Sequence, residues 1–285
     1  MPKERLEFGS VTLGYGFSLV IICLSNQNGM LTDERNVPKL LWLSPTILTW
    51  IAKPLISDSG DNVWRRPYEI WSHAESLLQG DPSEFQRTDE LTTLKRAIDR
   101  REQQLNTFHN FKRIPIADKP KGGLELLEYL GLIRPLMLQR LIKIRNAVEH
   151  EDTPPPTVQE LRIFVEFVWY FLRSTDNNLR NPIEEFSLEP RESSPYGVEV
   201  RLSSKTNWIP KIRASVEPGM LSIEQKDGWF LINMIKIETR QQVLEKSPEE
   251  TGLAGKNPDD ILFDGEVRAP KEAILQLIRI SLQLV

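Results

Sequence analysis

One short segment of the chain holds the side chains best suited to catalysis. Arg145, Asn146 and His150 follow an apolar stretch and precede the prolines at 154–156. Arginine binds two phosphate oxygens at once, and histidine titrates near neutral pH. Asn146 and His150 are four residues apart and share a helical face, whereas Arg145 lies about 100° from Asn146 around the helix. Convergence of the three side chains therefore requires a break in the helix, which we expect just after His150.

The segment Arg145-Asn146-Ala-Val-Glu-His150 resembles the signature of the HEPN superfamily (higher eukaryotes and prokaryotes nucleotide-binding domain). In that signature an arginine precedes a polar residue, a few variable residues and a histidine. The resemblance covers roughly residues 61–173, and only the short motif is specific. It implies an all-α bundle that usually dimerises and brings two motifs into one cleft. It also implies that Arg145 contacts the scissile phosphate, His150 is the general acid or base, and Asn146 orients the site.

The residue types agree with cleavage of RNA without a metal or cofactor. Attack by the ribose 2′-hydroxyl needs proton transfer and a fixed positive charge on the phosphate, and it leaves a cyclic phosphate. We therefore expect an endoribonuclease, and the resemblance implies that it is of a toxin or antiviral-defence type, with an antitoxin or defence-system protein as a further partner. The alternative is a noncatalytic module of the same family that binds a nucleotide, RNA or a protein.

A structural interpretation of the same segment needs no chemistry. Arg145 then pairs with Glu149 at the i,i+4 spacing, Asn146 caps a turn, and His150 packs at a helix end. An enzyme requires Arg145 and His150 to converge on solvent, whereas a scaffold tolerates them in a salt bridge. For the other histidines, His73 and His109, we favour structural or surface roles, and a helix dipole would favour a charged His109.

A local excess of positive charge predicts an RNA-binding surface. From Phe85 to His150 the chain has 13 Lys or Arg and 8 Asp or Glu, although the whole chain has a net charge of -4. A basic face on the middle helices can guide an RNA backbone. Ordinary solvated charges are the alternative. The candidate RNA-binding residues are Lys95, Arg96, Arg100, Arg101, Lys112 and Arg113.

Composition indicates a globular protein of 285 residues, 40% of them hydrophobic and 27% charged, with room for two domains. The one cysteine cannot form an internal disulfide, which favours a reducing, cytoplasmic compartment. The apolar run Val11 to Leu24 is shorter than the roughly 20 residues of a spanning helix and is interrupted by glycines, so no membrane partner is expected.

Hydrophobic periodicity predicts several helices and strands. Expected helices are Pro67 to Gln79, Thr88 to Phe111, Leu124 to Leu130, Pro135 to His150, Val158 to Arg173 and Pro270 to Leu284. Expected strands are one or two in Leu6 to Ser25, then Tyr196 to Leu202, a segment from Leu221, Trp229 to Ile237, and a short one near Ile261. For Leu40 to Ile56 periodicity does not choose between a short helix and irregular structure.

Together these elements predict an α+β protein built on a central, HEPN-like helical bundle. The expected parts are an N-terminal segment (1–60), the bundle (61–176), a linker (177–195) and a small β-rich C-terminal domain (196–285). The helix from Val158 to Arg173 is apolar over most of its circumference, so it is either central or shared with a second subunit, and a homodimer is expected. A third hypothesis places a ligand surface at Trp208 and Trp229, which are otherwise core residues.

Overall fold

The computed structural model describes residues 40–55, 65–180, 182–192, 194–246, 257 and 260–283. All of them belong to one compact unit, residues 37–285. The strands expected between Leu6 and Ser25 lie outside the described residues. Among the helices that the structure describes, none combines the length and the apolar character needed to cross a membrane.

Five helices follow one another in the first half of this unit. They are α1 (Arg66–Leu77), α2 (Glu84–His109), α3 (Gly123–Tyr129), α4 (Leu136–His150) and α5 (Val158–Arg180). Ser83 begins α2 with a capping box, in which its hydroxyl accepts from the Gln86 amide and Gln86 accepts from the Ser83 amide. Asn110, in the left-handed conformation at φ 49°, ends it. The predicted helices are therefore present, with shifted ends.

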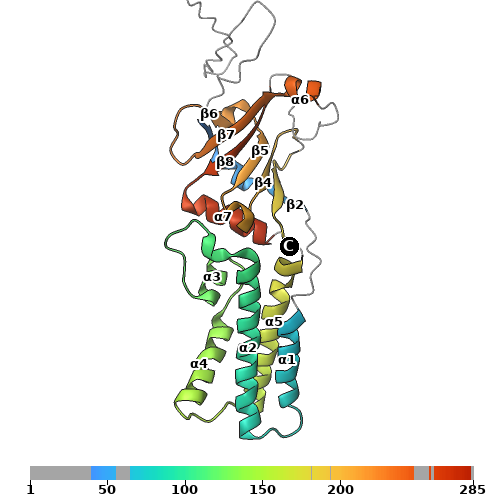
Figure 1. The fold of residues 1–285 in the computed structure, drawn as a ribbon, viewed down its shortest axis with the longest axis vertical. Coiled ribbons are helices and arrows are strands. Elements are labelled where there is room, and N and C mark those ends of the chain that lie inside the picture. The colour runs from blue at the N-terminus through green and yellow to red at the C-terminus, as the bar shows by residue number, and fades with distance from the viewer. Residues whose placement is uncertain are drawn as a thin grey trace, which may run out of the picture. The chain divides into compact units, whose positions relative to one another are not determined.

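An eight-stranded antiparallel sheet forms the other part of the unit (Figure 1). Its strands are β1 (Leu40–Leu43), β2 (Ile51–Leu55), β3 (Glu185–Glu189), β4 (Gly197–Arg201), β5 (Lys211–Ser215), β6 (Leu221–Ser222), β7 (Phe230–Thr239) and β8 (Ile261–Arg268). Their order is β2-β3-β4-β5-β8-β7-β1-β6. Short helices η2 (Pro45–Thr49), η4 (Phe111–Arg113), η5 (Ser204–Thr206), η6 (Pro218–Met220) and α6 (Arg240–Lys246) connect elements, and α7 (Lys271–Gln283) packs against η2.

The short link between β1 and β2 requires the sheet to curl. These strands are six positions apart in the sheet, about 29 Å in a flat sheet at about 4.8 Å per strand. Only residues 44–50 connect them, and five of those form η2, which rises about 2 Å per residue. The link cannot span a flat sheet, so the sheet bends until β2 approaches β1. Val200, Ile212 and Phe263 share one face of the sheet and are buried.

The expected central helical bundle with a small C-terminal β-rich domain is wrong, although the α+β class is consistent. The sheet begins before the helices, and α1 to α5 are inserted between its neighbouring strands β2 and β3. Leu41 pairs with Ile232, and Ala52 pairs with Leu188. Hydrophobic periodicity reflects only neighbouring residues, so it cannot predict strand pairs that are this far apart in the sequence. The predicted linker 177–195 contains the last turn of α5 and all of β3.

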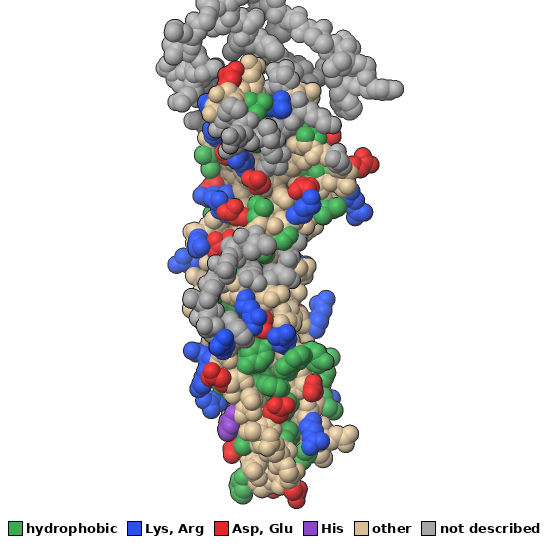
Figure 2. Space-filling model, turned by 90° about the vertical axis from the view of Figure 1, so that its right-hand side faces the viewer, with side chains coloured by type: hydrophobic (Ala, Val, Ile, Leu, Met, Phe, Trp, Pro, Cys, Tyr) green, Lys and Arg blue, Asp and Glu red, His purple; other side chains and the backbone are tan. Residues whose placement is uncertain are grey.

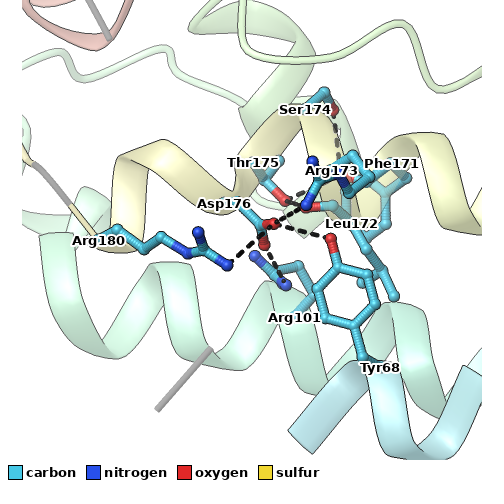
Figure 3. Close-up of polar contacts among 9 residues, drawn as sticks. All are labelled: Tyr68, Arg101, Phe171, Leu172, Arg173, Ser174, Thr175, Asp176 and Arg180. Atoms are coloured by element: carbon cyan, nitrogen blue, oxygen red, sulfur yellow. Dashed lines mark hydrogen bonds and ion pairs between the residues drawn. The ribbon is translucent and has the colours of Figure 1, made fainter. Parts of the chain in front are cut away.

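A buried ion pair joins the helices of this insertion (Figure 3). Arg101 Nη2 on α2 lies 2.9 Å from Asp176 Oδ1 on α5, and the two side chains are 0% and 5% exposed. The Tyr68 hydroxyl on α1 donates to the other Asp176 oxygen at 2.8 Å, and Arg101 lies over the Tyr68 ring. Burial, with Asp176 beside it, raises the pKa of Tyr68 to about 12. One carboxylate thus fixes three helices.

His109 joins the end of α2 to α5 and to the sheet. Its Nε2 lies 2.8 Å from the Asn178 carbonyl oxygen, its ring stacks on Phe111, and its own carbonyl accepts from Trp208 Nε1. Burial lowers the pKa of His109 to about 4. The cost of burying a charged ring therefore exceeds the stabilisation that the helix end gives to the imidazolium. The neutral ring therefore donates from Nε2 to Asn178. Trp208 is 1% exposed, so it is a core residue and not part of a ligand surface.

Glu90 on α2 is a buried carboxyl group without compensation. Its residue is 0% exposed, and neither carboxyl oxygen has a hydrogen-bond partner within the described part of the chain. Burial raises the pKa of Glu90 from 4.5 to about 8. The carboxyl group is therefore protonated at neutral pH in the folded protein and ionised in the unfolded chain.

We expect stability to fall as pH rises from about 4.5 to about 8, because the unfolded chain releases the Glu90 proton at a lower pH than the folded one. Replacing Glu90 with Gln removes this dependence, which amounts to about 3 kcal/mol at pH 7. Urea unfolding of both proteins at pH 5 and pH 8 measures it. An equal loss of stability between pH 5 and pH 8 in the wild-type and Glu90→Gln proteins would show that Glu90 is not the source of the pH dependence.

Candidate functional site at the end of helix α4

Helix α4 carries the predicted catalytic residues on an unbroken helix. Leu138 and Leu141 are buried and hold it against its neighbours. The Glu151 amide still donates to the Ala147 carbonyl at 2.9 Å, so helical hydrogen bonding extends through His150. The chain turns only at Asp152, where φ is 51°, and the prolines at 154–156 prevent any continuation. The expected break therefore comes after the histidine.

Arg145 is held by an acidic side chain of its own helix. Its Nη2 forms an ion pair with Glu149, and the two side chains are 24% and 23% exposed. Its Nη1 donates to Asn146 Oδ1 at 3.1 Å. The other Glu149 oxygen accepts from the Thr92 hydroxyl of α2 at 2.7 Å. The charge of Arg145 is thus neutralised, as the structural interpretation of this segment requires.

His150 does not converge with Arg145. Residues 145 and 150 are about 140° apart around a continuous helix at about 100° per residue. Asn146 and His150 are both exposed on the shared face that their spacing predicts. Neither a hydrogen bond nor an ion pair of the His150 side chain is found among the described residues. The structure therefore brings Arg145 and Asn146 together and leaves His150 apart.

The predicted RNA-binding residues divide into three kinds. Arg96 and Arg100 are exposed on α2, and Lys112 and Arg113 are exposed on η4. Lys95 is ion-paired with Asp99 on the next turn of α2. Arg101 is the buried partner of Asp176, so it cannot reach RNA in this conformation. Neighbouring arginines of α2 thus have opposite roles.

An exposed polar face spans α2 and α4, and we call it the polar face. It contains Arg96 and Arg100 of α2 with Lys143, Asn146 and His150 of α4. The two helices lie side by side (Figure 1) and are joined at Thr92 and Glu149. Because they run in opposite directions, Arg96 is about level with Asn146, and Arg100 lies about one turn beyond it toward the start of α4.

The cavities of the described residues lie elsewhere. Three hollows of about 20, 190 and 330 Å³ surround residues including Trp208, Asn177 and Phe167, respectively, and none is lined by Arg145, Asn146 or His150. Within the described ranges, no group of three or more His, Cys, Asp or Glu side chains could hold a metal ion. Asn146 and His150 are exposed on α4, and the candidate site lies outside these three hollows.

Comparison of the chain with family models, curated proteins and solved structures gave no match. The HEPN-like motif therefore stays a resemblance of six residues, without support over the length of the chain. The function has to be argued from the geometry of the polar face.

Replacing Glu149 with Gln tests the restraint on Arg145. We expect a loss of stability of about 0.5 kcal/mol, because an i,i+4 pair on a helix surface contributes little. RNA affinity should rise about threefold or more, since the freed guanidinium gains a phosphate contact. Urea unfolding and titration of a labelled RNA measure the two effects. Unchanged or weaker RNA binding would contradict the role given to Glu149.

Proposed function

We propose that this protein binds the phosphate backbone of RNA through its polar face without cleaving it. The observation that carries the proposal is the exposure of Arg96, Arg100 and Lys143 on adjoining helices. None of these three side chains forms an ion pair within the described part of the chain. Lysine and arginine side chains displace counterions from phosphates and supply most of nonspecific affinity. The proposal places the protein in the cytoplasm, where its one cysteine needs no disulfide partner.

The proposal of binding without cleavage rests on the pairing of Arg145 with Glu149. A ribonuclease of the expected type needs a free guanidinium next to the phosphate, and here Glu149 occupies it. Removing Arg145 from this pair would leave a partly buried carboxylate bonded only to Thr92 among the contacts described. Arg145 therefore acts as a structural residue. Sequence analysis left binding without catalysis open as an alternative, and this alternative becomes the main proposal.

Ribonuclease activity is the second proposal, and the exposure of His150 favours it. An exposed imidazole on the RNA-binding surface can exchange protons with a bound ribose. Incubation of a mixed-sequence RNA in excess EDTA, with His150→Ala as control, decides between the two proposals. Intact RNA with both proteins supports binding alone. Cyclic-phosphate ends formed only by the protein with His150 would establish cleavage.

The binding proposal is tested by reversing charge on the polar face. Fluorescence anisotropy of a labelled 20-nucleotide RNA, in EDTA and at several salt concentrations, should give a dissociation constant in the micromolar range (about 10⁻⁶ to 10⁻⁴ M). Arg96→Glu with Arg100→Glu should weaken binding at least about tenfold and reduce the salt slope by about 2.

The matched control is Arg191→Glu with Arg268→Glu, which changes total charge equally at two exposed arginines of the sheet part of the unit. It should leave affinity within about twofold, because these residues lie outside the polar face. An equal loss of affinity in the two double variants would mean that overall charge, and not this face, binds RNA.

A further inference from the structure

Helix α5 exposes a stripe of large apolar side chains, which we call the apolar stripe. Ile163, Phe167 and Tyr170 are 45%, 39% and 60% exposed, and their spacing of four and three residues places them on one face. Figure 2 shows hydrophobic side chains gathered on the surface of the helical part, among charged ones. Ser174 and Asn177 continue the same face for about two further turns, and both are exposed. The face therefore changes from apolar to polar toward the end of α5.

A groove runs along this face, and we call it the α5 groove. Two hollows, of about 330 and 190 Å³, share Gly131, Leu132 and Ser174 in their linings, so they are neighbouring parts of one groove. Its walls are α5 on one side and the link between α3 and α4 on the other. From Phe167 to Asn178, the first and last residues of α5 in the two linings, the helix rises about 16 Å. A groove of this length is large enough for a small molecule.

The first half of the α5 groove is apolar. Phe167 and Tyr170 of the apolar stripe line the larger hollow together with Phe171 and Met137. Arg134 is the one charged side chain among the described residues that line it, and it is exposed. An apolar group is favoured in this half, because it removes the exposed rings from water. A cation is disfavoured there, since it would lie near the Arg134 guanidinium.

The second half of the groove is polar but uncharged. Within the described part of the chain, no ionisable side chain lines the smaller hollow, and its polar side chains are Ser174, Asn177, Asn178 and Gln283. Amide and hydroxyl groups both donate and accept hydrogen bonds. A carboxylate or an ammonium group would enter this half without an opposite charge, which is unfavourable. The lining therefore suits an uncharged head group that donates and accepts hydrogen bonds.

These polar side chains keep hydrogen-bonding capacity for a ligand. The Ser174 hydroxyl donates to the Phe171 carbonyl at 3.0 Å, so its oxygen can still accept. No hydrogen bond of the Asn177 side chain is found among the described residues. Asn178 donates from Nδ2 to the Leu282 carbonyl at 2.9 Å, whereas its buried Oδ1 has no hydrogen-bond partner in the described ranges. A buried acceptor without a partner is costly, so a donor at this end of the groove is stabilising.

We propose that the α5 groove binds a small amphipathic molecule with an apolar body and an uncharged head group that forms hydrogen bonds, such as the primary amide of an acyl chain. The body lies on Phe167 and Tyr170, and the head lies at Ser174 and Asn177. The described residues that line the groove include none of the polar face, so the inference is independent of the proposed RNA binding.

Titration of the full chain with octanamide, octanoate and octylamine tests the proposal, with binding followed by saturation-transfer NMR. The three probes have chains of the same length and differ in the charge of the head group at neutral pH. Octanamide should bind with a dissociation constant of about 10⁻⁴ to 10⁻³ M, at least about fivefold tighter than the two charged probes. No binding of octanamide at about 5 mM, or equal or tighter binding of a charged probe, would overturn the proposal.

Three variants at exposed positions locate the binding site. Tyr170→Ala should weaken octanamide binding at least about fivefold, because the body loses an aromatic contact. Ile163→Ala is the matched control, since Ile163 belongs to the apolar stripe but lines neither hollow, and it should leave affinity within about twofold. Asn177→Leu should reduce the preference for octanamide over octanoate to about twofold or less.

Circular dichroism of each variant confirms that it is folded. Equal losses of octanamide affinity in Tyr170→Ala and Ile163→Ala would show that the body does not lie in the α5 groove. An unchanged preference for octanamide in Asn177→Leu would contradict the place given to the head group.

Discussion

The carboxylate of Asp176 is the contact on which the helical insertion depends. It receives Arg101 from α2 and Tyr68 from α1, and Arg173 and Arg180 of its own helix lie 3.5 and 3.9 Å from it. Removing charges from water is costly, and a buried pair repays that cost only with good geometry and further hydrogen bonds. Because other helix packings would leave Arg101 or Asp176 uncompensated, the pair selects one arrangement of α1, α2 and α5.

That arrangement decides which surfaces remain available for binding. With α2 fixed against α5, Arg96 and Arg100 point away from the contact and adjoin α4 on the polar face. The apolar stripe of α5 is left uncovered on another side, next to the partly buried side chains of α4. Two neighbouring arginines illustrate the division of roles, since Arg100 is exposed and Arg101 is 0% exposed.

Much of the helical part could be predicted from sequence, because apolar spacing at three and four residues reports one buried face. The role of Arg101 was missed, although it lies three residues after Ile98 and seven after Leu94, on the buried side of α2. The end of α5 was missed because Thr175, Asp176 and Asn178 are polar and yet buried. The pairing of β1 and β2 with strands far along the chain leaves no local pattern.

The role of the segment Arg145 to His150 stays a prediction, whereas the geometry of its side chains is given by the structure and not by the sequence. The helix ends where the sequence predicts, just after His150, because the Glu151 amide still donates to the Ala147 carbonyl. A break at this position does not bring Arg145 and His150 together. The i,i+4 spacing of Arg145 and Glu149 predicts a possible ion pair. The decision between this pair and a free arginine required the position of Thr92 on another helix, which holds Glu149 in place.

The most direct test of this account is the free energy of unfolding of Asp176→Leu, measured with urea beside Arg101→Met and the double variant. The account predicts a loss of about 3–5 kcal/mol for Asp176→Leu, because the buried guanidinium loses its ion pair. The double variant should be more stable than Asp176→Leu alone, because no buried charge is left behind. A loss below about 1 kcal/mol for Asp176→Leu would contradict the claim that this carboxylate fixes the helices.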